Sequence, residues 1–295
     1  MKYRHSFHAG NFADVHKHVT LLALLAALKR KDKRFLYLDT HAGRGSYDLS
    51  SPSPEAAAGI GRFVAARHAA PELREYASLL ASFRARPGQR HRYPGSPVIA
   101  ALELRPQDRA VLIELSAAEA QPLRASLEAL TAHGDAGAGS GPAAAPRVHI
   151  ERGDGFERLR AFLPPPERRA LTLIDPPYEE TREDFGRLSE ALAEGLRRFP
   201  TGVFVAWYPI KEERSTAAWL AHLPRALPAP VLVSELWLYP RDSRAGLNGS
   251  GLLIANPPYL TLERMQVWLP ELQRSLAAGP GGGASARVCQ NAPDE

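Results

Sequence analysis

Residues 171–178 constrain the fold of this 295-residue chain more than any other segment. The run Leu-Thr-Leu-Ile predicts a buried strand, and Asp175 follows it directly. Pro176 and Pro177 come next, and they end the strand because proline has no N–H to donate to a neighbouring strand. An acid, two prolines and Tyr178 therefore stand at the carboxyl end of a strand, which is where open α/β sheets bind their ligands.

The rest of the chain predicts an α/β fold with a mostly parallel, doubly wound sheet, because strand patterns alternate with helical ones. Strands are expected at residues 35–38, 110–114, 147–151, 171–174, 202–208, 231–238 and 251–255. Helices are expected at residues 14–29, 98–104, 117–132, 156–162, 183–198 and 214–222, with Asp14 as the cap of the first. The last two strands are neighbours in sequence and are expected to form an antiparallel edge.

The domain organisation follows from length and local composition. A chain of 295 residues can form one domain, and we expect residues 1–295 to do so. Residues 50–95 are punctuated by proline and show helical patterns only, so we expect a small helical insertion without strands. Residues 134–146 predict a flexible surface loop, and residues 278–295 a mobile tail.

The tetrapeptide at 175–178 suits an exocyclic amine on a flat ring. Asp175 can accept one N–H of the amine, the Pro176 carbonyl can accept the other, and Tyr178 can stack on the ring. Asp-Pro-Pro-Tyr resembles the signature of amino-methyltransferases, which transfer a methyl group from S-adenosylmethionine to such nitrogens. A second copy at residues 256–259, Asn-Pro-Pro-Tyr, follows the last predicted strand instead of the fourth. We therefore interpret it as a structural strand terminator with an aromatic cover.

Three other candidate sites follow the first three predicted strands. Asp39 opens a loop that contains Gly43 and Gly45, and this loop resembles the one that cradles the methionine part of S-adenosylmethionine. Glu114 could accept the ribose hydroxyls of the cofactor, and Asp154, after Gly153, could accept its adenine amine. Each feature alone is more typical of an ordinary turn or a solvated acid, but all of them in strand order indicate a methyltransferase. Tyr208 and Pro209, after the fifth strand, are candidates for the target pocket.

The distribution of charge suggests a polyanionic partner. The net charge is +5 and the isoelectric point is about 9.4, and five of the six lysines lie within residues 1–33. Tyr3, Arg4, His5 and Lys17 mix cations with rings, as an RNA-facing surface requires, although a solvated helix face would look similar. No signal peptide or membrane-spanning run is apparent, so a cytoplasmic protein is expected. The histidines complete no metal-ligand set, so no metal is expected.

These motifs together resemble the RlmJ family, bacterial methyltransferases that modify adenine 2030 of 23S ribosomal RNA at N6. The resemblance covers nearly the whole chain and is densest at residues 3–11, 14, 17–18, 36–43, 93–97, 154–156, 173–179, 207–209 and 256–258. It implies a Rossmann-like class I methyltransferase fold with a helical insertion. It also implies cofactor contacts at His18, His41, Ser96, Glu114, Gly153, Asp154 and Asp175, and a target-facing role for Tyr3.

The expected function is therefore methylation of that adenine with S-adenosylmethionine as methyl donor and S-adenosylhomocysteine as product. Asp175, Pro176 and Tyr178 are the expected catalytic residues, and Tyr3, Arg4, His5 and Lys17 the expected RNA contacts. The expected partner is 23S ribosomal RNA before full ribosome assembly, bound by a monomer with no membrane association. A DNA adenine-N6 methyltransferase and an RNA protein that binds the cofactor without catalysis remain alternatives.

Overall fold

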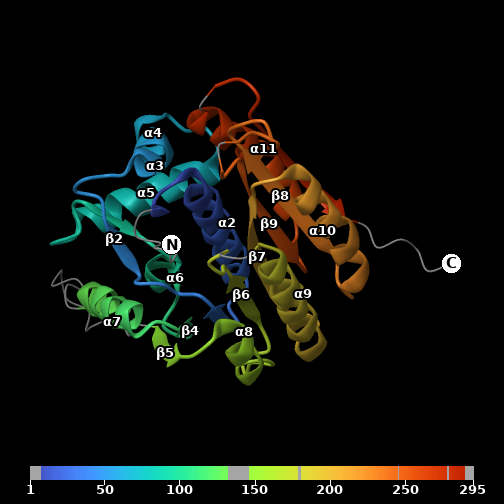
Figure 1. Cartoon of the computed structure of the whole chain (residues 1–295). Helices are drawn as coiled ribbons and strands as arrows, with labels where there is room; N and C mark the ends of the chain where they lie inside the picture. The colour runs from blue at the N-terminus through green and yellow to red at the C-terminus, as the bar shows by residue number, and fades with distance from the viewer. Residues whose placement is uncertain (1–7, 132–145, 179–180, 245, 278, 290–295) are drawn as a thin grey trace.

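The computed structural model describes residues 8–131, 146–178, 181–244, 246–277 and 279–289. Its centre is an eight-stranded sheet with the order β10-β8-β9-β7-β6-β1-β4-β5 (Figure 1). The strands are β1 (Leu36–Asp39), β4 (Arg109–Glu114), β5 (Arg147–Arg152), β6 (Ala170–Ile174), β7 (Val203–Ile210), β8 (Val231–Trp237), β9 (Gly249–Ala255) and β10 (Gly283–Cys289). The predicted α/β class and the seven predicted strands are confirmed.

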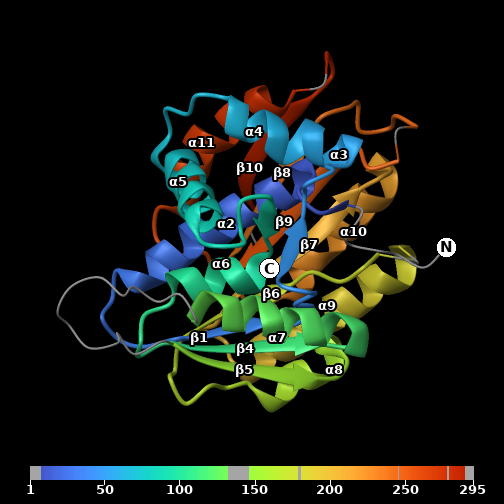
Figure 2. The ribbon, with the colours of Figure 1, turned by 90° about the vertical axis from the view of Figure 1, so that its left-hand side faces the viewer.

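The five strands β5, β4, β1, β6 and β7 are parallel, and helices cover both of their faces (Figure 2). On one side of the sheet lie α2 (Phe12–Lys29), α6 (Ser96–Glu103) and α7 (Ala117–Thr131). On the same side α5 (Pro71–Ala85) packs on α2, and α11 (Thr261–Leu276) packs on β8 and β10. The other side packs against α8 (Gly155–Arg158), η2 (Leu159–Ala161), α9 (Thr181–Arg198) and α10 (Glu213–Ala226). Burial on both sides explains why β1 and β6 lack the polar alternation of a half-exposed strand. No helix in these described ranges has the length and apolarity to span a membrane.

The antiparallel edge is confirmed but is wider than expected. β9 pairs with both β7 and β8 in antiparallel register, as the neighbouring runs predicted. The expected mobile tail is wrong for Gly283–Cys289, which form β10 and pair with β8 from Gly283 opposite Trp237 to Cys289 opposite Val231. The sequence gives little sign of this strand because its small residues carry weak β-propensity, and pairing with β8 supplies the order.

The insertion contains helices, but the expectation that it lacks strands is wrong. Its helical segments are α3 (Pro54–Ala56), η1 (Ala57–Gly61), α4 (Arg62–Ala65) and α5, and a two-stranded ribbon closes it. The ribbon pairs β2 (Ser46–Asp48) with β3 (Arg92–Pro94), and the buried Tyr47 and Tyr93 face each other across it. These strands are too short to show a periodic pattern. Nearly all of the predicted loop at 134–146 lies outside the described residues.

Helix α2 begins earlier than predicted, and it carries polar residues into the core. Asn11 is its cap, with the side-chain oxygen accepting a hydrogen bond from Asp14 N at 3.0 Å. Asp14 instead lies in the first turn and accepts from Gly10 N at 2.9 Å. The helix is enclosed between the sheet, the insertion and α11, so His16, Lys17 and His18 are all buried. Two of these three contribute to the candidate site.

Candidate active site

A cavity of about 780 Å³ opens at the carboxyl ends of the parallel strands. The turns after β1, β4, β5 and β6 line it, and they bring together four segments that are far apart in sequence. The starts of α6 and α9 and the first half of α2 complete the wall. Its volume lies within the range of small-molecule and cofactor sites.

The turn after β1 approaches the cavity with its backbone. Gly43 has φ of +63°, a conformation that L side chains rarely adopt, and a Cβ there would come within 2.7 Å of the Tyr47 hydroxyl oxygen. Its N–H donates to Glu114 Oε2 at 2.8 Å. Gly155 is similarly required, because a Cβ would meet the Thr40 carbonyl oxygen at 1.9 Å. These close approaches join the turns after β1, β4 and β5 into one wall.

Asp39 ends β1 and is fully buried beneath this wall. Its carboxylate accepts hydrogen bonds from Ser96 Oγ at 2.7 Å, Tyr37 Oη at 2.9 Å and His41 N at 3.2 Å. Burial raises the pKa of Asp39 from its ordinary 3.8 to about 6, against the effect of the Ser96 and Tyr37 donors. Ser96, a predicted cofactor contact, lines the cavity, and its hydrogen bond also orients Asp39.

The raised pKa of Asp39 gives a pH-dependent stability. Between about pH 4 and 6 the folded chain binds the proton more tightly than the unfolded chain, so this group's contribution to stability falls as pH rises. Compared with Asp39→Asn, whose amide does not titrate, the natural chain should lose about 2 kcal/mol of unfolding free energy between pH 4 and pH 7. Urea unfolding at several pH values measures this difference. A pH-independent difference would contradict the assignment.

The two acids predicted to bind the cofactor both line the cavity. Glu114 accepts from Gly43 N and, at 2.6 Å, from Ser116 N, and burial raises the pKa of its carboxyl despite these donors. Asp154 caps α8 and forms an ion pair with Arg187 at 2.7 Å. Partial burial would raise the pKa of Asp154, but the hydrogen bond and positive charge of Arg187 lower it below its ordinary value. Both side chains are thus held in place before any ligand binds.

The predicted histidines line the same cavity. His18 Nδ1 contacts Tyr93 Oη at 2.8 Å, and His41 packs edge-on against Phe156 with ring centroids 4.9 Å apart. Burial lowers the pKa of His41 to about 4, so this ring is neutral at physiological pH. Gly153 has φ of +156° and supports the turn that carries Asp154, but it does not itself line the cavity.

Asp175 and Lys17 meet at one end of the cavity. The Lys17 ammonium contacts Asp175 Oδ2 and lies 2.9 Å from Asp14 Oδ1, and the three side chains are almost fully buried. Burial alone would lower the pKa of Lys17, but the two carboxylates raise it, so the lysine stays charged. The expectation that Lys17 lies on an exposed RNA-facing surface is wrong. It is a wall residue of the site.

The prolines and Tyr178 separate after Asp175. Pro176 and Pro177 line the cavity, as the motif predicts. Tyr178 instead turns into the core, where its hydroxyl donates to the Trp207 carbonyl at 2.6 Å and its ring packs against Trp207 and Phe185. In this structure it is not among the residues that line the cavity. Tyr208 is also absent from the lining, because its hydroxyl donates to the buried Glu235 at 3.0 Å.

The second copy of the motif lies at the amino ends of the parallel strands, away from the cavity. β9 is antiparallel to β7, so Asn256 follows Ala255 beside Phe204, near the start of β7. Its amide donates to the carbonyls of Pro200 and Gly202 at 2.7 and 2.8 Å, and Tyr259 is 82% exposed. Asn256 thus ends β9 away from the cavity, as predicted, but an aromatic cover by Tyr259, which the interpretation also included, is wrong because that ring is exposed.

Several residues at the cavity were not predicted. Arg44, Leu115, Phe156 and Arg187 line it, although only their neighbours carried a motif signal. Arg187 is the most informative, because its guanidinium lies 4.5 Å from the Phe156 ring centroid while it pairs with Asp154. Tyr3, Arg4 and His5 lie outside the described residues. Within the described ranges, no cluster of three His, Cys, Asp or Glu side chains could hold a metal ion.

Comparison with known proteins identifies the family. A family model described as "Ribosomal RNA large subunit methyltransferase D, RlmJ" matches residues 32–288. The chain is 38% identical over 298 residues to the ribosomal RNA large subunit methyltransferase J of Escherichia coli strain K12, with 100% of both chains covered. It belongs to the RlmJ family. The Haemophilus influenzae Rd protein of the same name is 36% identical over 280 residues, covering 94% of each chain.

A solved structure shares this fold over nearly the whole chain. A crystal structure of protein LPL1258 from Legionella pneumophila superposes with a TM-score of 0.80 at 34% identity, covering 97% of this chain and 99% of that one. The strand order and the ligand cavity at the carboxyl ends of the strands are those of a Rossmann-like class I methyltransferase. The predicted family and fold class are therefore confirmed.

Proposed function

We propose that this chain methylates the N6 amine of adenine 2030 in 23S ribosomal RNA. The observation that carries the proposal is that Asp175 lines the same cavity as Glu114 and Asp154. An acceptor for an amine and two acceptors suited to a ribose and an adenine thus share one site. Two proteins similar to this chain over nearly its whole length are named ribosomal RNA large subunit methyltransferases, which supports RNA as the carrier of the target base.

The cavity fits a cofactor of the S-adenosylmethionine type. The volume is sufficient, the glycine turn leaves room for a ligand against the backbone, and the Glu114 carboxylate is held by two N–H donors so that it faces the cavity. When bound, the cofactor supplies an electrophilic sulfonium methyl group. We assign Glu114 to the ribose hydroxyls, Asp154 to the adenine amine, and His18, His41, Gly43 and Ser96 to the remaining wall.

The chain's own part in the reaction is to orient the target amine. Lys17 holds Asp175 through Oδ2, which leaves Oδ1 to accept one N–H of the adenine N6. The Pro176 carbonyl accepts the second N–H, and these two bonds direct the nitrogen lone pair toward the methyl group. Positioning of this kind can supply several kcal/mol of the barrier reduction. A stacking role for Tyr178 requires its ring to leave the contacts with Phe185 and Trp207.

Methyl transfer in vitro tests the proposal and its alternatives. With tritiated S-adenosylmethionine, the protein should label 23S ribosomal RNA extracted from a strain that lacks it, and the label should map to N6 of one adenine. Labelling of adenine-containing DNA instead would establish the DNA methyltransferase. Cofactor binding without labelling of either would establish a binding protein.

The same assay tests the expected substrate state. Action before full ribosome assembly predicts that naked 23S RNA is labelled and that assembled large subunits are labelled poorly. Equal labelling of both would contradict that expectation. The oligomeric state of the active protein follows from light scattering in the same buffer, where a monomer is expected.

A further inference from the structure

A basic surface lies at the amino ends of the parallel strands, at the opposite end of these strands from the cavity. Three connections meet there, because each enters one of the adjacent parallel strands β4, β1 and β6. They are residues 30–34 before β1, residues 104–108 before β4, and residues 166–169 before β6. Lys17 lies near the end of α2 that faces the cavity, and Lys29 lies at the other end of this helix. At a rise of 1.5 Å per residue, the two residues are about 18 Å apart along the helix axis.

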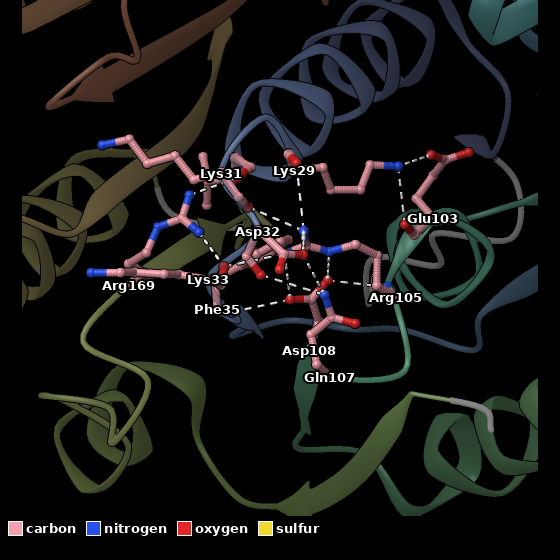
Figure 3. Close-up of polar contacts among 11 residues, drawn as sticks. Lys29, Lys31, Asp32, Lys33, Phe35, Glu103, Arg105, Gln107, Asp108 and Arg169 are labelled. Carbon is pink, nitrogen blue, oxygen red and sulfur yellow. Dashed lines mark hydrogen bonds and ion pairs between the residues drawn. The ribbon is translucent and has the colours of Figure 1, made fainter.

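Two arginines fix the backbone of the first connection (Figure 3). Arg105 donates to the carbonyls of Lys31 at 3.1 Å and Lys33 at 3.2 Å. Arg169 donates to the carbonyls of Leu28, at 2.7 Å, and Lys33. The connection is therefore held by side chains from both flanking connections.

A buried acid anchors Arg105 in turn. Asp108 accepts from Arg105 Nε at 2.9 Å and from Phe35 N at 3.1 Å, and its side chain has no exposed surface. Both guanidinium groups, of Arg105 and Arg169, lie 5.9 Å from the Phe35 ring centroid. Burial and the positive charge of Arg105 together lower the pKa of Arg169. The fold thus concentrates cations here and uses two of them to stiffen a short loop.

The side chains on this loop point outward and are mostly basic. Exposed cations on this surface are Arg30, Lys31, Lys33, Arg34 and Arg168, and none of them forms an ion pair with an acid in the described part of the chain. Two acids lie among them. Asp32 is fully exposed, with Oδ1 3.8 Å from Arg105 Nη1. Glu167 forms an ion pair with Arg109, and its charge also interacts with that of Arg34. Figure 3 shows the Lys31 and Lys33 side chains leaving the loop toward the side where Arg169 lies.

The chemistry of the surface fits phosphates better than a protein partner. Protein interfaces place apolar and aromatic side chains at their centre, and the exposed large apolar residues of the described chain all lie elsewhere. A short loop whose exposed lysines form no ion pair in the described ranges instead suits a polyanionic backbone, where each lysine can replace a counterion. Because side chains hold the backbone of this loop before binding, little backbone entropy of the loop is lost on association.

We propose that Arg30, Lys31, Lys33, Arg34 and Arg168 form a second RNA-binding surface that holds phosphates of a segment distant from the target adenine. The proposal rests on the proposed function, because it requires an RNA substrate. In this proposal the cavity selects the base, and the second RNA-binding surface contributes affinity for a long, folded RNA.

The test uses the double variant Lys31→Ala/Lys33→Ala with two substrates, full-length 23S RNA and a short hairpin that carries the target adenine. For the long RNA, Kd should rise at least tenfold at physiological salt, and the slope of log K against log salt should fall by about 2. For the hairpin, kcat/KM should stay within about twofold of the natural chain, because it is too short to reach both the cavity and the second RNA-binding surface.

The matched control is Arg264→Ala/Arg274→Ala, which removes two exposed cations from α11. It should leave both substrates unaffected. Two results would overturn the second surface, provided that the natural chain methylates RNA. One is an unchanged Kd of the lysine variant for the long RNA, and the other is an equal loss of affinity and activity on both RNAs. If the natural chain itself labels no RNA, the proposed function has failed instead.

Discussion

Asp175→Asn is expected to lower kcat for methyl transfer by about 10²–10³-fold, similar to the loss of one preorganised hydrogen-bonding group in other active sites. The amide keeps the shape of the side chain but can present an N–H where the target amine needs an acceptor. It also removes the negative charge that Lys17 binds. Single-turnover kinetics on the RNA substrate measure the chemical step without product release.

The second copy of the motif offers a control for Asp175→Asn. Asn256→Gly deletes two hydrogen bonds to the Pro200 and Gly202 carbonyls, while glycine tolerates the observed φ of +53°. This variant should lose thermal stability and retain kcat. Cofactor affinity, measured without RNA, should change little in Asn256→Gly. If Asp175→Asn turned over normally, Asp175 would not be the amine acceptor.

Lys17→Met should be the most destabilising single substitution at the site, with a loss of about 3–5 kcal/mol in unfolding free energy. The change removes the cation between Asp14 and Asp175 and leaves two buried carboxylates without it. The raised pKa of Lys17 means that its contribution is present at neutral pH and is lost only as pH rises through the folded-state value. Urea unfolding at pH 7 measures the loss.

Lys29→Met is the matched control for the same helix. Its ion pair with Glu103 has about a quarter of each side chain exposed, so its removal should cost about 1 kcal/mol or less. Equal losses in the two variants would contradict the buried-triad interpretation. Loss of methyl transfer by Lys17→Met at temperatures where the variant remains folded would add a role in orienting Asp175.

The strands and the acids at their ends could be predicted because they depend on local patterns. The prolines after Asp175 end β6 by a purely local effect, and Asp39, Glu114 and Asp175 each follow an apolar run. Parallel strands then bring these ends to one edge whatever the details of packing. For the same reason the copy at Asn256 could be excluded from the site by strand order alone.

The directions of Lys17 and Tyr178 could not be predicted because they depend on tertiary packing. A lysine in a basic segment ordinarily faces solvent, and only the enclosure of α2 by the sheet, the insertion and α11 shows that Lys17 is buried. The Tyr178 ring adjoins Asp175 in sequence, but Phe185 and Trp207, from α9 and β7, attract it into the core. β10 was missed for a related reason, since its order comes from β8.

The long sequence separations within the site have a consequence for biosynthesis. Lys17 and Asp175 are 158 residues apart, and α2 leaves the ribosome long before β6. Until β6 and the residue after it are made, Lys17 of the nascent helix lacks Asp175, one of the two carboxylates that it contacts in the folded chain. The methyl donor can stabilise only a chain in which all four turns have met. A shortened translation product that ends before Asp175 should therefore have neither donor affinity nor activity.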